Sequence, residues 1–197
     1  MARPSRFREP DVLTRAMLVF WQHGFAGTSV RHLEQATGLT ASSLYNRFDS
    51  KESLFASVLD HYIVKVVQWR IDRYLRADDA LAGLRRFFDS TYDYISEQRP
   101  PMACLLANTA LEKSATDHAV RAQLDRGLAL LEDAFTDCLQ RAVQAGQLRA
   151  DCDCRRWARH LLLCLQGVLV DSTIHPDHAR LSELVDGVMA ALPLQQH

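Results

Sequence analysis

The sequence predicts an all-α protein. Apolar residues recur every three or four positions along almost the whole chain, no stretch alternates as a half-buried strand does, and glycines or prolines separate the periodic stretches. The chain has 197 residues, of which 48% are hydrophobic, so it can bury a core and is not expected to be disordered. We expect about nine helices, arranged as a three-helix amino-terminal head on a larger helical body.

The first three predicted helices are short and follow one another closely. The first carries an apolar stripe and stops at Gly24, a suitable helix C-cap. The second is capped by Thr28 or Ser29, and Gly38 separates it from the third, which is capped by Thr40. Two short helices joined by a tight turn are typical of a helix-turn-helix, so residues 1–50 are predicted to form a DNA-binding domain.

The third predicted helix has an apolar face and a polar face. Leu44 and Phe48 are four positions apart and turn inward, which leaves Ser42, Ser43 and Asn46 on the opposite side. Small polar side chains at these positions can approach base edges. Charge gives weak support, because residues 1–51 hold seven basic and four acidic groups in a chain whose net charge is −1.

Residues 51–197 are predicted to form the body, because the periodicity stays helical to the end of the chain. The expected helices extend from Lys51 to about Arg76, Asp79 to Gln98, Met102 to Ser114, Asp117 to Ala145, Trp157 to Val170, and from the break at His175 and Pro176 to Leu192. No run of about eighteen apolar residues and no apolar leader occurs, so we expect a cytoplasmic protein with no membrane partner.

The last two predicted helices are unusually apolar. The stretch LLLCLQGVLV is apolar almost all round, and such a helix needs burial on all sides. A second copy of the chain would bury it, and Gly167 would allow two helix backbones to approach closely, so a four-helix homodimer contact is predicted. The alternative is that both helices only close a monomeric core. The expected interface residues are Leu161, Leu165, Gly167, Val168, Leu181, Leu184, Val185 and Val188.

The head carries a motif that resembles the tetracycline-repressor (TetR) family of bacterial transcription regulators. Its residues are Phe20, Gly24, Phe25, Thr28, Ser29, Leu33, Ala36, Gly38, Leu39, Ser43, Leu44, Tyr45, Phe48, Lys51 and Leu54. One departure is Glu34, where many members have a small alanine. The resemblance implies a homodimeric repressor of double-stranded operator DNA, a near-palindromic operator, and release by a small-molecule inducer bound in the body.

The resemblance also implies roles for single residues. Thr28, Ser29 and Lys51 would lie at helix amino-terminal ends, which favour phosphate. Tyr45 would contact a phosphate, while Arg47 either contacts one or is solvated. Asn46 is the strongest candidate for a base contact, because its amide can make two hydrogen bonds to adenine. The residues expected to face the groove are Thr40, Ala41, Ser42, Ser43 and Asn46.

The segment PPMACLLANTALE resembles a branch of the family with a CLL-x-N-x-x-x-E pattern entering its sixth helix. Here Cys104, Asn108 and Glu112 are four positions apart and are expected to share a helix face. Cys104 would lie in the first turn, where free N–H groups lower a thiol pKa, so thiol modification is an alternative to reversible ligand binding. A small buried cysteine that only packs is the other interpretation.

Aromatic side chains of the body could line an apolar effector pocket, although each could equally be ordinary core. The candidates are Trp69, Phe88, Tyr92, Phe135 and Trp157, with Asn108, Glu112 or His160 as orienting polar groups. The identity of the inducer does not follow from them.

The sequence shows no catalytic, metal or cofactor motif. The five cysteines are expected to be reduced thiols, and Cys152-x-Cys154 without a second pair is a weak zinc signal that is better explained as a polar turn. A helical enzyme using Cys104 as nucleophile with His160 is a rival hypothesis, but it leaves the head unexplained. A structural chromosome-associated protein that binds DNA without sequence preference is another.

Overall fold

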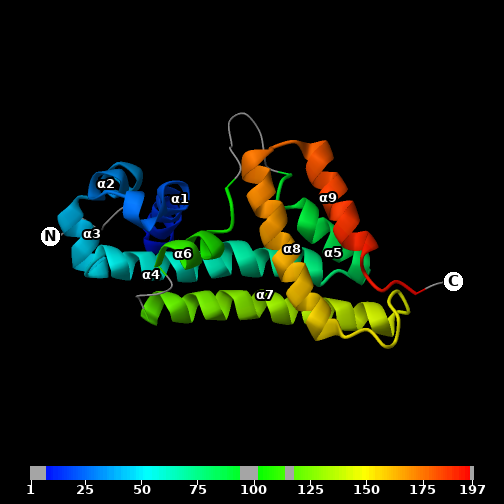
Figure 1. Ribbon diagram of the computed structural model, residues 1–197. Helices are drawn as coiled ribbons and strands as arrows, with labels where there is room; N and C mark the ends of the chain where they lie inside the picture. Colours follow the sequence, from blue (N-terminus) through cyan, green and yellow to red (C-terminus); the bar gives the residue numbers. More distant parts are fainter. Residues whose placement is uncertain (1–7, 94–101, 114–117, 196–197) are drawn as a thin grey trace. The chain divides into compact units, whose positions relative to one another are not determined.

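The computed structural model describes residues 8–93, 102–113 and 118–195, and this part of the chain contains nine α-helices, two π-helical segments and no strand (Figure 1). The predicted all-α fold is therefore confirmed. The elements are α1 (Glu9–Gly27), α2 (Val30–Thr37), α3 (Ala41–Phe48), α4 (Lys51–Tyr62), η1 (Ile63–Gln68), η2 (Ile71–Leu75), α5 (Ala80–Asp89), α6 (Leu105–Lys113), α7 (His118–Gln144), α8 (Cys154–Ile174) and α9 (His178–Ala190).

The chain divides into two compact units. The amino-terminal unit combines Met1–Lys65 with Leu105–Asp125, and the carboxy-terminal unit combines Val66–Cys104 with Arg126–His197. The amino-terminal unit thus holds α1 to α4 together with α6, which comes from much later in the sequence. The proposed DNA-binding domain of residues 1–50 lies within this unit.

The amino-terminal unit is built around three phenylalanine rings. Phe20 stacks on Phe25 with the ring centroids 6.1 Å apart, and Phe55 from α4 tilts against both, at 4.8 Å and 5.1 Å. All three are buried. Burial of each ring stabilises the fold by about 1.5–3 kcal/mol, so this cluster joins α1 firmly to α4. Leu33 and Leu44 add the inward faces of α2 and α3 to the same core.

The first helix differs from its prediction at its end. Gly24 has φ 69° and ψ 176°, which breaks the helix as expected, but one further helical turn follows, so α1 extends to Gly27. The left-handed region suits glycine because it has no Cβ. The next helix is capped by Ser29, whose Oγ accepts a hydrogen bond from the His32 N–H at 3.2 Å.

The fourth predicted helix is helical as far as expected, but its hydrogen bonding changes along its length. After Tyr62 it widens into η1 and then η2. The carbonyls at the end of η2 are satisfied by Arg141 of α7, which donates to the oxygens of Leu75 and Ala77. Gly83 of α5 lies so close to this segment that a Cβ would stand 2.4 Å from the Tyr74 carbonyl oxygen.

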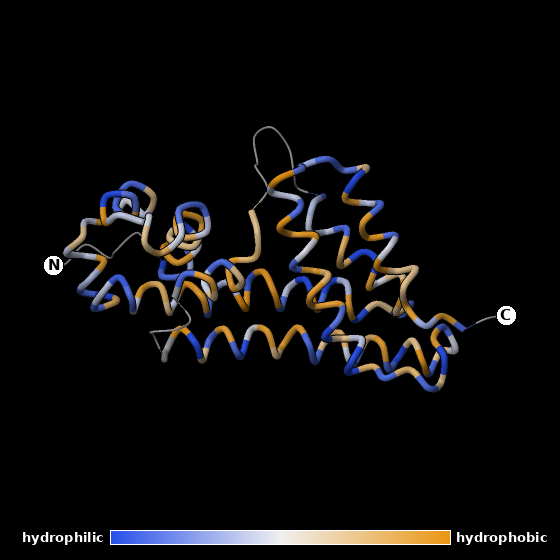
Figure 2. The backbone as a smooth tube through the Cα atoms, in the orientation of Figure 1, coloured by the Kyte–Doolittle hydropathy of each residue, from blue (hydrophilic) through white to orange (hydrophobic). Residues whose placement is uncertain are grey.

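The carboxy-terminal unit contains α5, α8 and α9. Asp79 caps α5, Asp153 caps α8 and Asp177 caps α9, each by accepting a backbone N–H three residues further on. The fifth helix was expected to reach Gln98 but ends at Asp89, and residues 94–101 lie outside the described part, as does the expected boundary at Ser114 and Asp117. Figure 2 shows apolar and polar residues alternating along α7 and α8, as amphipathic helices require.

Candidate nucleic-acid interface and regulatory sites

Helix α3 presents a polar face and buries an apolar one. Leu44 and Phe48 are buried, whereas Ser42, Ser43 and Asn46 are exposed, as the sequence predicts. Among the other residues expected to face a groove or a phosphate, Thr40 is exposed while Ala41 and Tyr45 are half-buried. The helix therefore offers a short row of small polar side chains on one side.

The amino-terminal end of α3 is capped by two side chains. The Ser43 N–H donates to Oγ1 of Thr40 at 3.3 Å, and the Ala41 N–H donates to Oε1 of Glu34 at 2.7 Å. Glu34 was identified from the sequence only as a departure from a family alanine. Its role as a cap was missed because the carboxylate comes from α2, and helix-start patterns describe only caps local to the helix.

Thr28 and Ser29 have different environments. Ser29 is exposed at the start of α2, whereas Thr28 is 1% exposed and its hydroxyl donates to the Gly24 carbonyl at 2.6 Å. The Thr28 side chain is therefore buried and hydrogen-bonded within the unit, contrary to its prediction as a phosphate contact. The hydroxyl bonds back to residue i−4, a local alternative that the threonine position alone does not reveal.

Two basic side chains, one near the end of α3 and one at the start of α4, have partners within the chain. Arg47 pairs with Glu9 of α1, with its Nη2 at 2.6 Å from Oε2. Lys51, the first residue of α4, holds its Nζ 4.4 Å from the centre of the Phe25 ring. Both side chains of the Arg47–Glu9 pair are about half exposed, so water screens the ion pair and its contribution to stability is small.

The predicted aromatic pocket residues are distributed over different environments. Phe88 and Phe135 are fully buried and pack against Phe87, so they form ordinary core. Tyr92 is buried and donates to Oδ1 of Asp89 at 2.7 Å; burial and then this carboxylate raise the pKa of Tyr92 to about 12. Trp69 is 56% exposed and packs edge-on to a neighbouring tyrosine. These four residues therefore differ in exposure and in their contacts.

Cys104, Asn108 and Glu112 also differ in their exposure. Cys104 is 4% exposed and immediately precedes α6, whereas Asn108 and Glu112 are exposed on the helix. The three residues therefore do not share one environment, because only the last two belong to the helix. The carboxylate of Glu112 accepts the backbone N–H groups of Phe25 and Ala26, a contact that the sequence did not predict.

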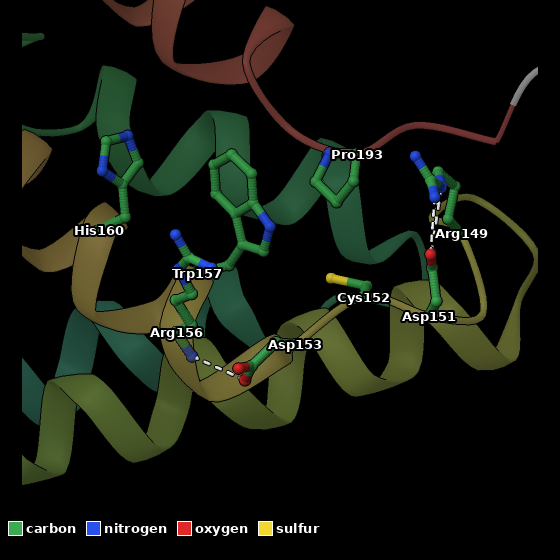
Figure 3. Close-up of a pocket in the computed structure, with 8 residues that line it drawn as sticks. All are labelled: Arg149, Asp151, Cys152, Asp153, Arg156, Trp157, His160 and Pro193. Atoms are coloured by element: carbon green, nitrogen blue, oxygen red, sulfur yellow. Dashed lines mark hydrogen bonds and ion pairs between the residues drawn. The ribbon is translucent and has the colours of Figure 1, made fainter.

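One cavity brings together two of the predicted pocket residues. It encloses about 430 Å³ beside the start of α8, and both Trp157 and His160 line it, with their ring centroids 5.3 Å apart (Figure 3). The rest of the lining comes from the connection between α7 and α8 and from the carboxy-terminal segment: Arg149, Asp151, Cys152, Asp153, Arg156 and Pro193.

The charged groups of this cavity are partly neutralised by one another. Arg149 forms a two-pronged pair with Asp151 at 2.6 Å and 3.0 Å, while Asp153 caps α8. Burial, followed by the neighbouring Cys154, raises the pKa of the Cys152 thiol to about 11. Cys152 is therefore a neutral thiol at physiological pH. Within the described ranges, no group of three or more His, Cys, Asp or Glu side chains is arranged to hold a metal ion.

The predicted dimer residues are mostly part of the subunit's own core. Leu161, Leu165, Val168, Leu181 and Val185 are buried within the chain, because α8 and α9 pack their most apolar faces against other helices of the unit. This corrects the prediction for these five residues. Gly167 and Leu184 are exposed and Val188 is half-buried.

The outer face of α8 carries a different apolar row. Leu163 is 71% exposed, Val170 is half exposed and Ile174 is 63% exposed, with Gly167 between them. Positions 163, 167, 170 and 174 follow the helical spacing of a single stripe. This exposed row therefore lies on a different side of α8 from Leu161 and Leu165, which the sequence predicts for a dimer contact.

Two family profiles match the chain. "Bacterial regulatory proteins, tetR family" matches residues 12–58, and "Tetracyclin repressor-like, C-terminal domain" matches residues 80–188. The second match alone spans more than half of the chain. The chain belongs to the TetR family. The resemblance seen in the sequence of the head is thereby confirmed.

Alignments with two bacterial regulators cover most of the chain. The HTH-type transcriptional repressor ComR of Escherichia coli (strain K12) is 28% identical over 86% of this chain and 81% of its own length. The uncharacterized HTH-type transcriptional regulator YezE of Bacillus subtilis (strain 168) is 28% identical over 98% of this chain and 100% of its own. This TetR-family chain is therefore similar to these regulators along both of its units.

A solved structure of a TetR family regulator is similar to this chain in fold and in part of its sequence. A cysteine mutant of the TetR family transcriptional regulator CifR, complexed with 26bp double-strand operator DNA, is 31% identical, with a TM-score of 0.85, over 97% of this chain and 100% of that one.

In the described part of the TetR-family chain, none of the helices has both the length and the apolar character needed to cross a bilayer.

Proposed function

We propose that this protein is a homodimeric transcriptional repressor that binds a near-palindromic operator and is released from it by a small-molecule effector. The observation that carries the proposal is the polar face of α3, which is exposed on a helix whose start is capped by Thr40 and Glu34. Support comes from the TetR family itself, whose profile covers residues 12–58, and from the operator DNA bound to CifR.

The proposed DNA contacts follow from exposure and chemistry. Asn46 contacts adenine through its amide, and Ser42 and Ser43 contact bases or nearby phosphates. Ser29 and Lys51 lie at the starts of α2 and α4, where the helix dipole favours phosphate, and Tyr45 presents its hydroxyl to the backbone. Further proposed groove-facing residues are Thr40 and Ala41. For Thr28, the contribution is restricted to its backbone.

The proposed dimer contact uses the outer row of α8. Leu163, Gly167, Val170 and Ile174 provide an apolar stripe with a small residue in it, and Leu184 and Val188 of α9 extend the surface. Helices of two subunits that pack through such stripes form a four-helix contact. A dimer would place two α3 helices on successive major grooves, about 34–36 Å or a multiple apart, which is why the operator should be a near-palindrome.

The first experiment measures sequence preference. DNA from upstream of the protein's own gene is titrated in a fluorescence anisotropy assay, with a shuffled DNA of the same composition as competitor. We expect affinity for one palindromic segment at least a thousandfold above that for the shuffled DNA. Equal affinity for both would refute a sequence-specific repressor and support a structural chromosome protein.

The second experiment tests the dimer. Leu163→Glu adds a charge to the outer row of α8, so we expect monomers by multi-angle light scattering and a large loss of operator affinity. Leu111→Glu is a matched control, because Leu111 is a 90% exposed leucine on α6. A dimeric Leu163→Glu variant would place the interface elsewhere.

The effector site is proposed to include the cavity beside α8. Trp157 offers an aromatic face, His160 is next to it, and the exposed Arg156 supplies a cation at the rim. A Trp157→Ala variant should bind operator normally but need more effector for release. Screening the compounds handled by enzymes encoded nearby would supply the effector for this test.

Thiol modification at Cys104 is the second candidate for the release signal. The observation that favours it is position: Cys104 immediately precedes α6, the helix that contacts α1 and α4 of the amino-terminal unit. A mild electrophile should then release operator from the wild type but not from Cys104→Ser. Release of both proteins would exclude this thiol as the trigger.

A further inference from the structure

The junction between α1 and α2 contains an interrupted helix. Gly24 leaves the helical conformation, with φ 69°, and the chain resumes one helical turn at Phe25 before Ser29 caps α2. The first N–H groups of a helical turn have no carbonyl partner within their own helix. The amides of Phe25 and Ala26 are such groups, and they lie four and three residues before Ser29.

Glu112 of α6 accepts both of these amides. The Phe25 N–H donates to Oε2 at 2.8 Å, and the Ala26 N–H donates to Oε1 at 2.5 Å. One carboxylate therefore binds two successive backbone donors, each through its own oxygen. Hydrogen bonds to a carboxylate are about twice as strong as neutral ones, and a negative charge is favoured at the start of a helical turn.

Gly24 provides the room for this contact. A Cβ at Gly24 would stand 3.0 Å from Oε2 and 3.4 Å from Oε1 of Glu112. A side chain at this position would thus press on the carboxylate, in addition to the strain of the positive φ. The glycine and the glutamate are therefore spatially matched, although 88 positions separate them in the sequence.

The segment 24–26 also contacts residues near the starts of α2 and α4. The Phe25 ring packs against Phe20 and Phe55 and lies beneath the Lys51 ammonium, and the Thr28 hydroxyl donates to the Gly24 carbonyl. A change in the Phe25–Ala26 turn would consequently shift the start of α2 and the cation at the start of α4. All of these groups belong to the amino-terminal unit.

We propose that Glu112 is a positioning residue for operator binding. Its carboxylate holds the Phe25–Ala26 turn, which sets the orientation of α2 and α3 relative to α1, so that α6 controls the geometry with which the head meets DNA. This inference rests on the proposed function, and it identifies the Glu112 carboxylate as the group through which α6 affects operator binding. Leu111 beside it is 90% exposed and serves as a control position.

The DNA test compares Glu112→Gln, Glu112→Ala and Leu111→Ala as full-length proteins. We expect Glu112→Ala to weaken operator binding by about tenfold or more, and Glu112→Gln to be intermediate because its amide oxygen remains an acceptor. Affinity for shuffled DNA should fall much less than operator affinity for every variant, since binding without base contacts depends on the number of exposed cations, which these substitutions leave unchanged. A purely structural role would instead lower both affinities together with the thermal midpoint.

Amide hydrogen exchange tests the contact without DNA. In Glu112→Ala the amides of Phe25 and Ala26 should exchange about tenfold faster or more, while those of Leu33 and Leu44 keep wild-type rates. If Glu112→Ala does not fold, Gly24→Ala, whose Cβ would displace the carboxylate, should show the same accelerated exchange at Phe25 and Ala26. Unchanged exchange would overturn the contact.

The two proposals fail in distinguishable ways. Faster exchange with unchanged operator affinity would overturn the positioning role while leaving the repressor function intact. A wild-type protein without any sequence preference would refute the repressor function and the positioning role with it, whereas the exchange rates would still report whether Glu112 holds the turn.

Discussion

Replacing Asn46 with alanine removes the proposed adenine contact without disturbing the fold. The Asn46 side chain is exposed on α3, and it has no hydrogen-bond partner among the residues that the structure describes. Alanine is also a better helix former, so the free energy of unfolding should change by no more than about 0.5 kcal/mol.

The expected loss of operator affinity is large because the contact occurs twice. A side chain that makes two hydrogen bonds to a base contributes about 1–3 kcal/mol of discrimination. A homodimer on a palindrome makes the contact in both half-sites, which gives about 2–6 kcal/mol, or a factor of about 30 to 20,000 in Kd. Affinity for shuffled DNA should be nearly unchanged, because that binding depends on phosphates.

The assay is fluorescence anisotropy with operator and shuffled DNA at one fixed salt concentration, together with thermal unfolding of each protein. Gln35→Ala is the matched control, because Gln35 is an exposed amide on α2 that is not proposed to contact bases. Our reasoning would be refuted if Asn46→Ala bound operator as tightly as wild type, or if it lost affinity for operator and shuffled DNA equally.

Three further predictions follow from charge and burial. Glu9→Gln releases Arg47 from its ion pair, so binding to any DNA should tighten and the slope of log affinity against log salt should steepen by about 0.9 per subunit; an unchanged slope would mean that Arg47 reaches no phosphate. Burial raises the pKa of Tyr92 from 10.0 to about 12, so the folded state keeps this proton more tightly than the unfolded state. Wild-type stability should therefore fall as pH rises from about 10 to about 12, and urea titrations of Tyr92→Phe should lack that part of the loss. Cys104 and Cys138 are buried, whereas the other three cysteines are half-buried, so peptide mass spectrometry should find Cys104 and Cys138 alkylated last; early labelling of Cys104 would favour its role as a sensor.

The predictions from the sequence were strongest where the deciding interactions are local. The start of α3 follows from Thr40, and the break in α1 follows from Gly24, because a cap and a positive φ depend on residues a few positions apart. The inward direction of Leu44 and the outward direction of Asn46 follow from helix geometry alone.

The predictions were weaker where a helix is apolar on several sides. The composition of α8 indicated two apolar surfaces but not which of them faces the subunit's own core. The sequence predicts Leu161 and Leu165 at a dimer contact, whereas the structure buries them within the subunit and leaves Leu163 and Ile174 exposed. Periodicity describes the angle between residues around a helix, and it does not say which neighbour each side will have.

The sequence by itself determined the all-helical fold, the helix-turn-helix and the polar face of α3, since each depends on periodicity and caps within a few residues. Only the tertiary structure showed that Glu34 caps α3 and that Glu112 holds the turn after Gly24. These carboxylates meet backbone amides of other helices, and a backbone amide has no residue type that a sequence pattern could reveal.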